Sequence, residues 1–174
     1  RSPGLVRVAV GGVADVGDRT YYSLTLSVTT PPEALRAAVS AFTEEHWTLE
    51  EATATLRDHA SCVTVCVQIE ERRMGECRVA ADAVLAALAD LDMAVPFAVV
   101  ECPKYEFLGT VCRYLPELGM HEVQCDADGT ALLPAHVLRT LTTRRTDPVA
   151  VLAEVRAHLG TAWDSVPTGC VVTP

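Results

Sequence analysis

The spacing of apolar residues along the chain divides it into segments of two kinds. In some segments apolar residues recur at every second position, which predicts strands, and in others they recur every three or four positions, which predicts helices. The expected strands cover residues 5–10, 21–29, 61–69 and 95–101. The expected helices cover residues 33–46, 48–57, 78–91, 135–141 and 148–159. Because strands and helices do not alternate strictly, this order predicts an α+β fold.

Turn residues indicate how the strands connect. Two glycine-containing turns, Gly11-Gly12 and Gly17-Asp18, separate the first two strands, so we expect these strands to form a hairpin. Asp128-Gly129 favours a tight turn and predicts a second hairpin between residues 121–126 and 130–133. Residues 105–115 fit a helix or a strand equally well.

The predicted strands are apolar on one side only. Val63, Val65, Val67 and Ile69 share one face of their strand, whereas the other face is small and polar. This pattern favours a mixed or antiparallel sheet with helices packed mainly on one face. We interpret the polar side of the sheet as a candidate interaction face, formed by Ser23, Thr25, Ser27, Thr64 and Gln68.

A chain of 174 residues has the length of one ordinary domain. No linker rich in Gly, Pro or Ser divides it, so we expect a single α+β domain over residues 1–164 and a flexible tail over residues 165–174. A division near Pro103 is the alternative.

Composition and charge narrow the function classes. A formal net charge of −9 disfavours nucleic-acid binding, which depends on neutralising phosphates with Lys and Arg. No segment has the length of a membrane span, so we expect no membrane partner. Lys104 is the single lysine and Asn does not occur, which indicates coding bias from a GC-rich genome.

The seven cysteines suggest free thiols in a reducing compartment, and hence a cytoplasmic or otherwise intracellular protein. Cys62 and Cys66 lie four residues apart on one predicted strand, about 13 Å, which is too far for a disulfide between them. Cysteine and histidine are also metal ligands, so a Cys/His metal-binding domain is one alternative. Its candidate ligands are His59, Cys62, Cys66, His121 and Cys125.

A second alternative comes from the segment that joins the strand over 61–69 to the following helix. Its residues Arg72 to Cys77 resemble the acetyl-CoA motif of GCN5-related N-acetyltransferases, Arg/Gln-x-x-Gly-x-Gly/Ala, with Arg72 and Gly75 matching. The resemblance implies an acyltransferase in which Arg72, Gly75 and Glu76 bind the pyrophosphate of acetyl-CoA and Tyr114 is the general acid. It also implies a cleft where the strands over 61–69 and 95–101 splay apart. The chain lacks the strand hairpin that this family places before its acetyl-CoA strand.

No other catalytic motif is present, which leaves a non-catalytic role as the main hypothesis. We predict a protein-interaction or regulatory domain that needs no cofactor, has a protein partner and is a possible homo-oligomer. The acetyl-CoA-binding enzyme and the Cys/His metal-binding domain remain the alternatives.

Overall fold

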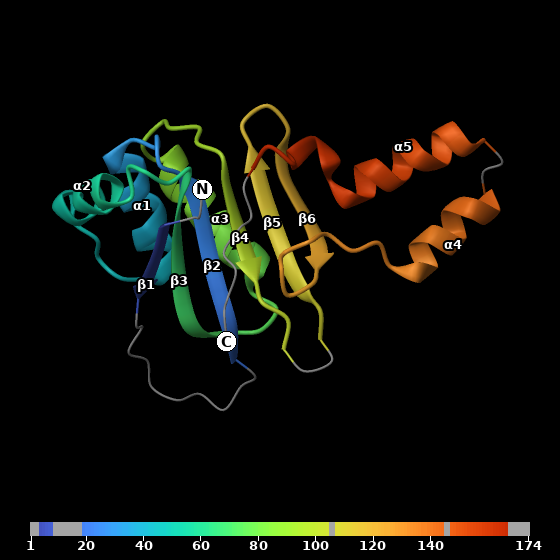
Figure 1. The fold of residues 1–174 in the computed structure, drawn as a ribbon, viewed down its shortest axis with the longest axis horizontal. Helices are drawn as coiled ribbons and strands as arrows, with labels where there is room; N and C mark the ends of the chain where they lie inside the picture. The colour runs from blue at the N-terminus through green and yellow to red at the C-terminus, as the bar shows by residue number, and fades with distance from the viewer. Residues whose placement is uncertain (1–3, 9–18, 105–106, 145–146, 167–174) are drawn as a thin grey trace.

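The computed structural model describes residues 4–8, 19–104, 107–144 and 147–166. Its centre is one sheet in the order β1-β3-β2-β4-β5-β6 (Figure 1). The strands are β1 (Gly4–Val8), β2 (Arg19–Ser27), β3 (Thr64–Arg73), β4 (Phe97–Glu101), β5 (Gly109–Leu115) and β6 (Gly119–Cys125). β1 and β3 are parallel, and the other neighbouring strands are antiparallel. The predicted α+β fold with a mixed sheet is therefore confirmed.

Helices cover one face of this sheet, as predicted. α1 (Pro32–Thr43) and α3 (Cys77–Ala89) contact each other and the sheet, and α2 (Leu49–Asp58) lies against α1. The main core lies between these helices and alternate residues of the central strands. Its largest fully buried side chains include Tyr22, Leu24, Leu26, Leu35, Phe42, Val65, Val67, Val84, Leu88, Phe97 and Val99.

The opposite face of the sheet is less uniformly polar than expected. Across β4, β5 and β6 it carries a second, small apolar cluster of Val100, Val111, Val123 and Cys125. The prediction of a polar face rested on β3, whose side chains on this face are Thr64, Cys66 and Gln68. This face is therefore mainly polar across β2 and β3 and apolar across β4, β5 and β6.

The first predicted hairpin is wrong. β2 pairs with β3 and β4, and β1 pairs in parallel with β3, for example Gly4 with Val65. β3 therefore lies between the two strands that were expected to be neighbours. The physical reason is the connection between them, residues 9–18, which is longer than ordinary hairpin loops of two to five residues and leaves the choice of partner to the sheet.

Two other strand assignments also change. β3 continues through Arg73, beyond its expected end at residue 69, because Arg19 and Thr20 of β2 provide partners for Arg73 and Arg72. The second hairpin is formed by β5 and β6, since Gly109 to Leu115 pair with Cys125 to Gly119. Beyond the Asp128-Gly129 turn only a single bridge forms, between Cys125 and Ala131.

The chain then forms α4 (Ala135–Arg144), α5 (Pro148–Leu159) and the short 3-10 helix η1 (Thr161–Trp163). Asp147 caps α5 through its side chain, which accepts from the Val149 N–H, and Gly160 ends the helix with a φ of 67°. Figure 1 shows α4 and α5 projecting from the edge of the sheet, away from α1 and α2. We call these two helices the arm.

The sheet runs continuously across position 103, because β4 and β5 pair on either side of it. Of the predicted tail, Ser165 is exposed and Val166 is buried, and the remainder lies outside the described residues. No helix in the described part of the chain combines the length and the apolar character that crossing a bilayer requires.

Candidate functional site: the helical arm and its root

The arm is built from helices that bury almost nothing. No residue of α5 is buried, and neither is any side chain of α4 that the structure describes. Several of the exposed residues are large and apolar: Leu138 is 45% exposed, Leu152 50% and Val149 75%. A helix with apolar residues around its circumference is normally surrounded by other protein. The arm therefore has an apolar surface without a partner in the described structure.

The root of the arm, where α5 meets the sheet, is fixed by a buried arginine. The Arg113 guanidinium of β5 donates to the Leu159 carbonyl at 2.8 Å and pairs with the Asp164 carboxylate at 3.0 Å. The Leu159 carbonyl belongs to the last turn of α5, where a positive charge is favoured by the helix dipole. Arg113 thereby joins the C-terminus of α5 to the middle of a strand.

Two aromatic side chains complete the root. The ring centroids of His121 on β6 and Trp163 on η1 are 4.8 Å apart, and the Trp163 indole N–H donates to the Gly119 carbonyl at 2.9 Å. Burial lowers the pKa of His121. A Cβ at Gly160 would lie 2.5 Å from the His121 ring, so only glycine allows the chain to pass this close. The root is a specific, tightly packed junction.

The angle between the arm and β6 encloses two adjoining hollows of about 430 Å³ and about 540 Å³. They share Glu122, Val137 and His158 as lining residues. His121 lines the first hollow and His136 the second. Further residues of α4 and α5 complete the first hollow, and residues of β5, β6 and the segment before α4 complete the second. The arm and its root therefore present both a projecting surface and a recess.

Charge distinguishes the arm from the rest of the chain. Residues 134–160 contain four arginines and two Asp or Glu residues, whereas the remaining chain contains ten Lys or Arg and 21 Asp or Glu residues. The arm is thus a basic segment attached to a strongly acidic body. Such a distribution favours the approach of an acidic surface.

The residues predicted to bind acetyl-CoA are already engaged within the protein. The Gly75 N–H donates to the Glu101 carboxylate at 2.8 Å, and the Glu76 N–H donates to the Tyr22 hydroxyl at 3.1 Å. Glu101 is 3% exposed and supplies the negative charge at the N-terminus of α3. A pyrophosphate bound at this turn would have to displace that carboxylate.

Of the other predicted acyltransferase residues, Arg72 lies beside Glu76, with its Nε 3.6 Å from that carboxylate, whereas Tyr114 lies apart from both. Arg72 donates to the Phe42 carbonyl at 2.9 Å and pairs with Glu44 at 3.2 Å. Tyr114 pairs with Phe97 at the first residue of β4, whereas Glu101 is the last residue of that strand. The two ends of β4 are about 13 Å apart. The strands β3 and β4 are both neighbours of β2, so they do not form the splayed pair that the resemblance implies.

The predicted interaction face is largely covered. Ser23, Thr25, Thr64 and Gln68 are all buried, and Ser27 is partly exposed at the end of β2. Their side chains share the sheet face opposite α1 and α3, as expected from the alternation. In this conformation only Ser27 presents a surface to a partner, so this face is not the most accessible one.

The cysteines divide into two groups. Cys62, Cys77, Cys102, Cys112 and Cys125 are free, as expected, but Cys66 forms a disulfide bond. The expectation of free thiols is therefore wrong for Cys66, while the exclusion of a Cys62–Cys66 bond is confirmed. Within the described ranges, no group of three or more His, Cys, Asp or Glu residues is arranged to hold a metal ion.

The amino-acid sequence predicts the helices of the arm but not their exposure. Its signal was available: in residues 148–159, apolar side chains occur around the whole helix. Such a pattern predicts burial, and a helix with this pattern is buried either by its own sheet or by a partner. Sequence alone does not distinguish these two outcomes.

Comparisons with known proteins place the chain in a family. No curated protein and no solved structure matches the sequence. One family model does match, over residues 34–167, a range that begins in α1 and includes the arm and its root. Since this range is more than half of the chain, the protein belongs to the DUF3145 family, described as "Protein of unknown function".

Proposed function

We propose that this chain is a protein-interaction domain and that the arm is its docking element. The observation that supports this most directly is α5, an apolar helix of 12 residues in which no residue is buried. Isolated helices of this length are marginally stable in water, and most helical stability in proteins comes from packing an apolar face. A partner that covers the arm would supply that packing.

The structure of the root favours the same role. Arg113, Trp163 and His121 hold the C-terminal end of α5 on the sheet, so the arm is presented at a fixed position. A docking element that is pre-positioned in this way loses less conformational entropy on binding. Burying its exposed apolar area would contribute roughly 25 cal/mol for each Å² removed from water.

The chemistry of the arm favours one kind of partner. Its exposed leucine and valine side chains need an apolar contact, and its arginines favour carboxylates. The matching surface is a protein face that combines exposed aliphatic residues with Asp and Glu.

Site-specific photocrosslinking in cells tests the proposal. A photoreactive amino acid at Val149, which is 75% exposed on α5, should form a discrete adduct with one protein. The same amino acid at Val79, which is 61% exposed on α3, is the matched control and should not. Leu152→Glu should weaken binding of the protein identified in this way. Equal crosslinking from both positions, or none from Val149, would contradict an interaction role for the arm.

A further inference from the structure

We propose that the partner of the arm is a second copy of this chain, and that each arm docks on the α1–α2 corner of the other copy in a two-fold dimer. We define the α1–α2 corner as residues 44–51. This inference rests on the proposed function and specifies its partner. It is carried by two surfaces of the chain that are both under-buried and are complementary in charge.

The α1–α2 corner has the chemistry that the arm requires. Leu49 is 45% exposed at the start of α2, next to Glu50 and Glu51, which are also exposed. Glu44, in a left-handed conformation with a φ of 61°, adds a further exposed carboxylate at the end of α1, one oxygen of which pairs with Arg72 at 3.2 Å. Among the ten residues of α2, all of which are described, Ala52 alone is buried. The corner therefore combines an exposed leucine with exposed carboxylates.

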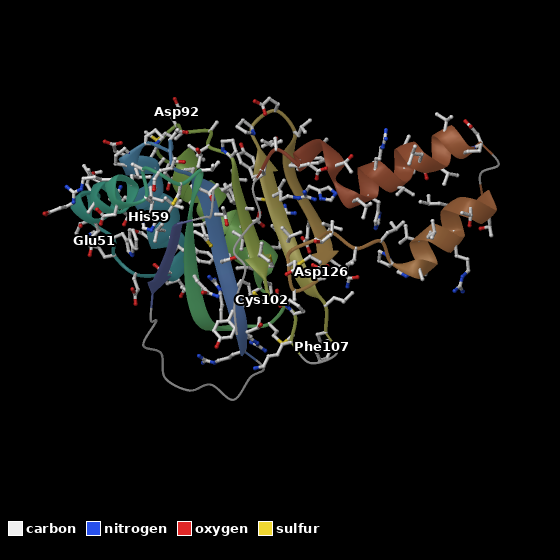
Figure 2. All side chains as sticks on the ribbon, in the orientation of Figure 1. Glu51, His59, Asp92, Cys102, Phe107 and Asp126 are labelled. Atoms are coloured by element: carbon white, nitrogen blue, oxygen red, sulfur yellow. The ribbon has the colours of Figure 1, made fainter. Side chains whose placement is uncertain are left out.

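The two surfaces lie at opposite ends of the molecule. With the longest axis horizontal, α2 is at one end and the arm is at the other (Figure 1). Figure 2 places Glu51 at the end remote from the arm. An arm therefore does not reach the corner of its own chain. Two antiparallel copies bring each arm to the corner of the other copy, and both contacts form at once.

Charge favours this arrangement over pairing of the two arms. Each arm is a segment with more arginine than carboxylate residues, so two arms in contact would bring like charges together. An arm on the acidic corner brings opposite charges together at both contacts. Two-fold symmetry forms this contact twice in each dimer. A charge change that weakens one contact about threefold therefore raises the dissociation constant of the dimer about tenfold.

Sedimentation of the purified chain over a range of concentrations, at low and high salt, is the first measurement. We expect a monomer–dimer equilibrium that shifts toward monomer as salt increases. Arg139→Glu on α4 and Glu50→Arg on α2 should each weaken the dimer about tenfold. Arg73→Glu, on an exposed residue of β3, makes the same charge change as Arg139→Glu and should leave the monomer–dimer equilibrium unchanged.

Mixing the two variants provides the decisive measurement. In the mixed dimer, the arm carrying Arg139→Glu would face the corner carrying Glu50→Arg, so opposite charges would meet again with their signs exchanged. The second contact would be unaltered, so association should return to the wild-type level. This recovery also shows that both variants are folded.

Three results would overturn the proposal. The first is a chain that stays monomeric at all concentrations, and the second is a dimer insensitive to both changes. The third is a dimer that Glu50→Arg leaves unchanged, which shows that the arm does not dock on the corner. Strengthening of such a dimer by Arg139→Glu would indicate arm–arm pairing, because this change removes like charge from the contact.

The crosslinking experiment separates this inference from the proposed function. An adduct from Val149 to a peptide of α2 in a second copy supports both. An adduct to a different protein overturns the second copy as the partner while leaving the interaction role of the arm in place.

Discussion

Glu101 and Arg113 are charged side chains that the fold buries to 3% and 5% exposure. Each lies at a helix terminus whose partial charge is opposite to its own. Glu101 accepts from the Gly75 N–H at the N-terminus of α3, and Arg113 donates to the Leu159 carbonyl at the C-terminus of α5. Both residues therefore position elements: Glu101 holds α3 against the sheet, and Arg113 holds the arm.

The free thiols should differ strongly in reactivity. Burial raises the pKa of Cys102 to about 11, so at pH 8 only about one molecule in a thousand carries the thiolate there. The neighbouring Cys112 thiol and burial raise the pKa of Cys77 as well. With iodoacetamide under native conditions, we expect Cys62 to react first and Cys77 to react only after unfolding. Mass spectrometry of tryptic peptides measures the order, and early modification of Cys77 would contradict this packing.

His121 should report the pH dependence of the root. Burial, with smaller contributions from the charges of Arg113 and His158, lowers its pKa in the folded state. The unfolded chain therefore binds this proton more readily, and the contribution of neutral His121 to stability is present above pH 6.5 and decreases below it. Protonation places a charge against Trp163, whose centroid is 4.8 Å away.

We expect Trp163 fluorescence to be quenched with a midpoint below pH 6.5. The Trp163→Phe variant gives the background signal of Trp47, and His121→Gln should abolish the step. A midpoint above 6.5 would show that His121 is stabilised in its charged form, contrary to its burial.

At the scale of elements, the sequence was informative about helices and less so about strand partners. α2 was predicted from Thr48 and Glu51, because a capping box is a local signal within four residues. The partner of β1 depends on β3, about 60 residues later in the chain, and nothing in residues 4–8 indicates it. The alternation in β2 did predict which of its side chains share a face, since that depends only on period two.

The capping box of α2 can be tested directly. The Thr48 side chain accepts from the Glu51 N–H at 3.2 Å, and the Glu51 carboxylate accepts from the Thr48 N–H at 2.8 Å. Thr48→Ala should lower the free energy of unfolding by about 1 kcal/mol in urea titrations. Thr53→Ala is the control on the same helix and should change it little, because the exposed Thr53 hydroxyl only bonds back to the Leu49 carbonyl.

The Thr48→Ala effect should also depend on pH. Hydrogen bonds from Thr48 lower the pKa of Glu51 in the folded protein. The Glu51 carboxylate therefore contributes to stability above the ordinary Glu pKa, and this contribution is lost as the pH falls through the pKa of Glu51 in the folded protein. The difference in the free energy of unfolding between wild type and Thr48→Ala should become smaller at acidic pH. A difference that is constant with pH would assign the effect to the bond from the Glu51 N–H to the Thr48 hydroxyl alone, because that bond does not depend on the charge of Glu51.

At the scale of the whole molecule, apolar burial is concentrated in one part of the chain. α1, α3 and the central strands contain almost all of the core, whereas the arm contributes none of it. The sequence predicted α5 as a helix, yet exposure of that helix depends on where the chain enters from β6 and on Arg113, which is 46 residues from Leu159. The arm as a candidate site was therefore visible only in three dimensions.

This uneven burial predicts two classes of amide hydrogen exchange in dilute, monomeric protein. Amides of α1, α3 and β2 should exchange through global unfolding, and those of α4 and α5 through local opening at lower free energy. Arg113→Gln removes the donors to the Leu159 carbonyl and the Asp164 carboxylate, so exchange in α5 should become about 10- to 100-fold faster, while α1 and α3 change little. Asp164→Asn should have a smaller effect, because the Asp164 side chain is 65% exposed and exposed ion pairs contribute little. If α5 instead exchanged as slowly as α1 in the monomer, the arm would be part of the cooperative core, and the need for a partner to cover it would disappear.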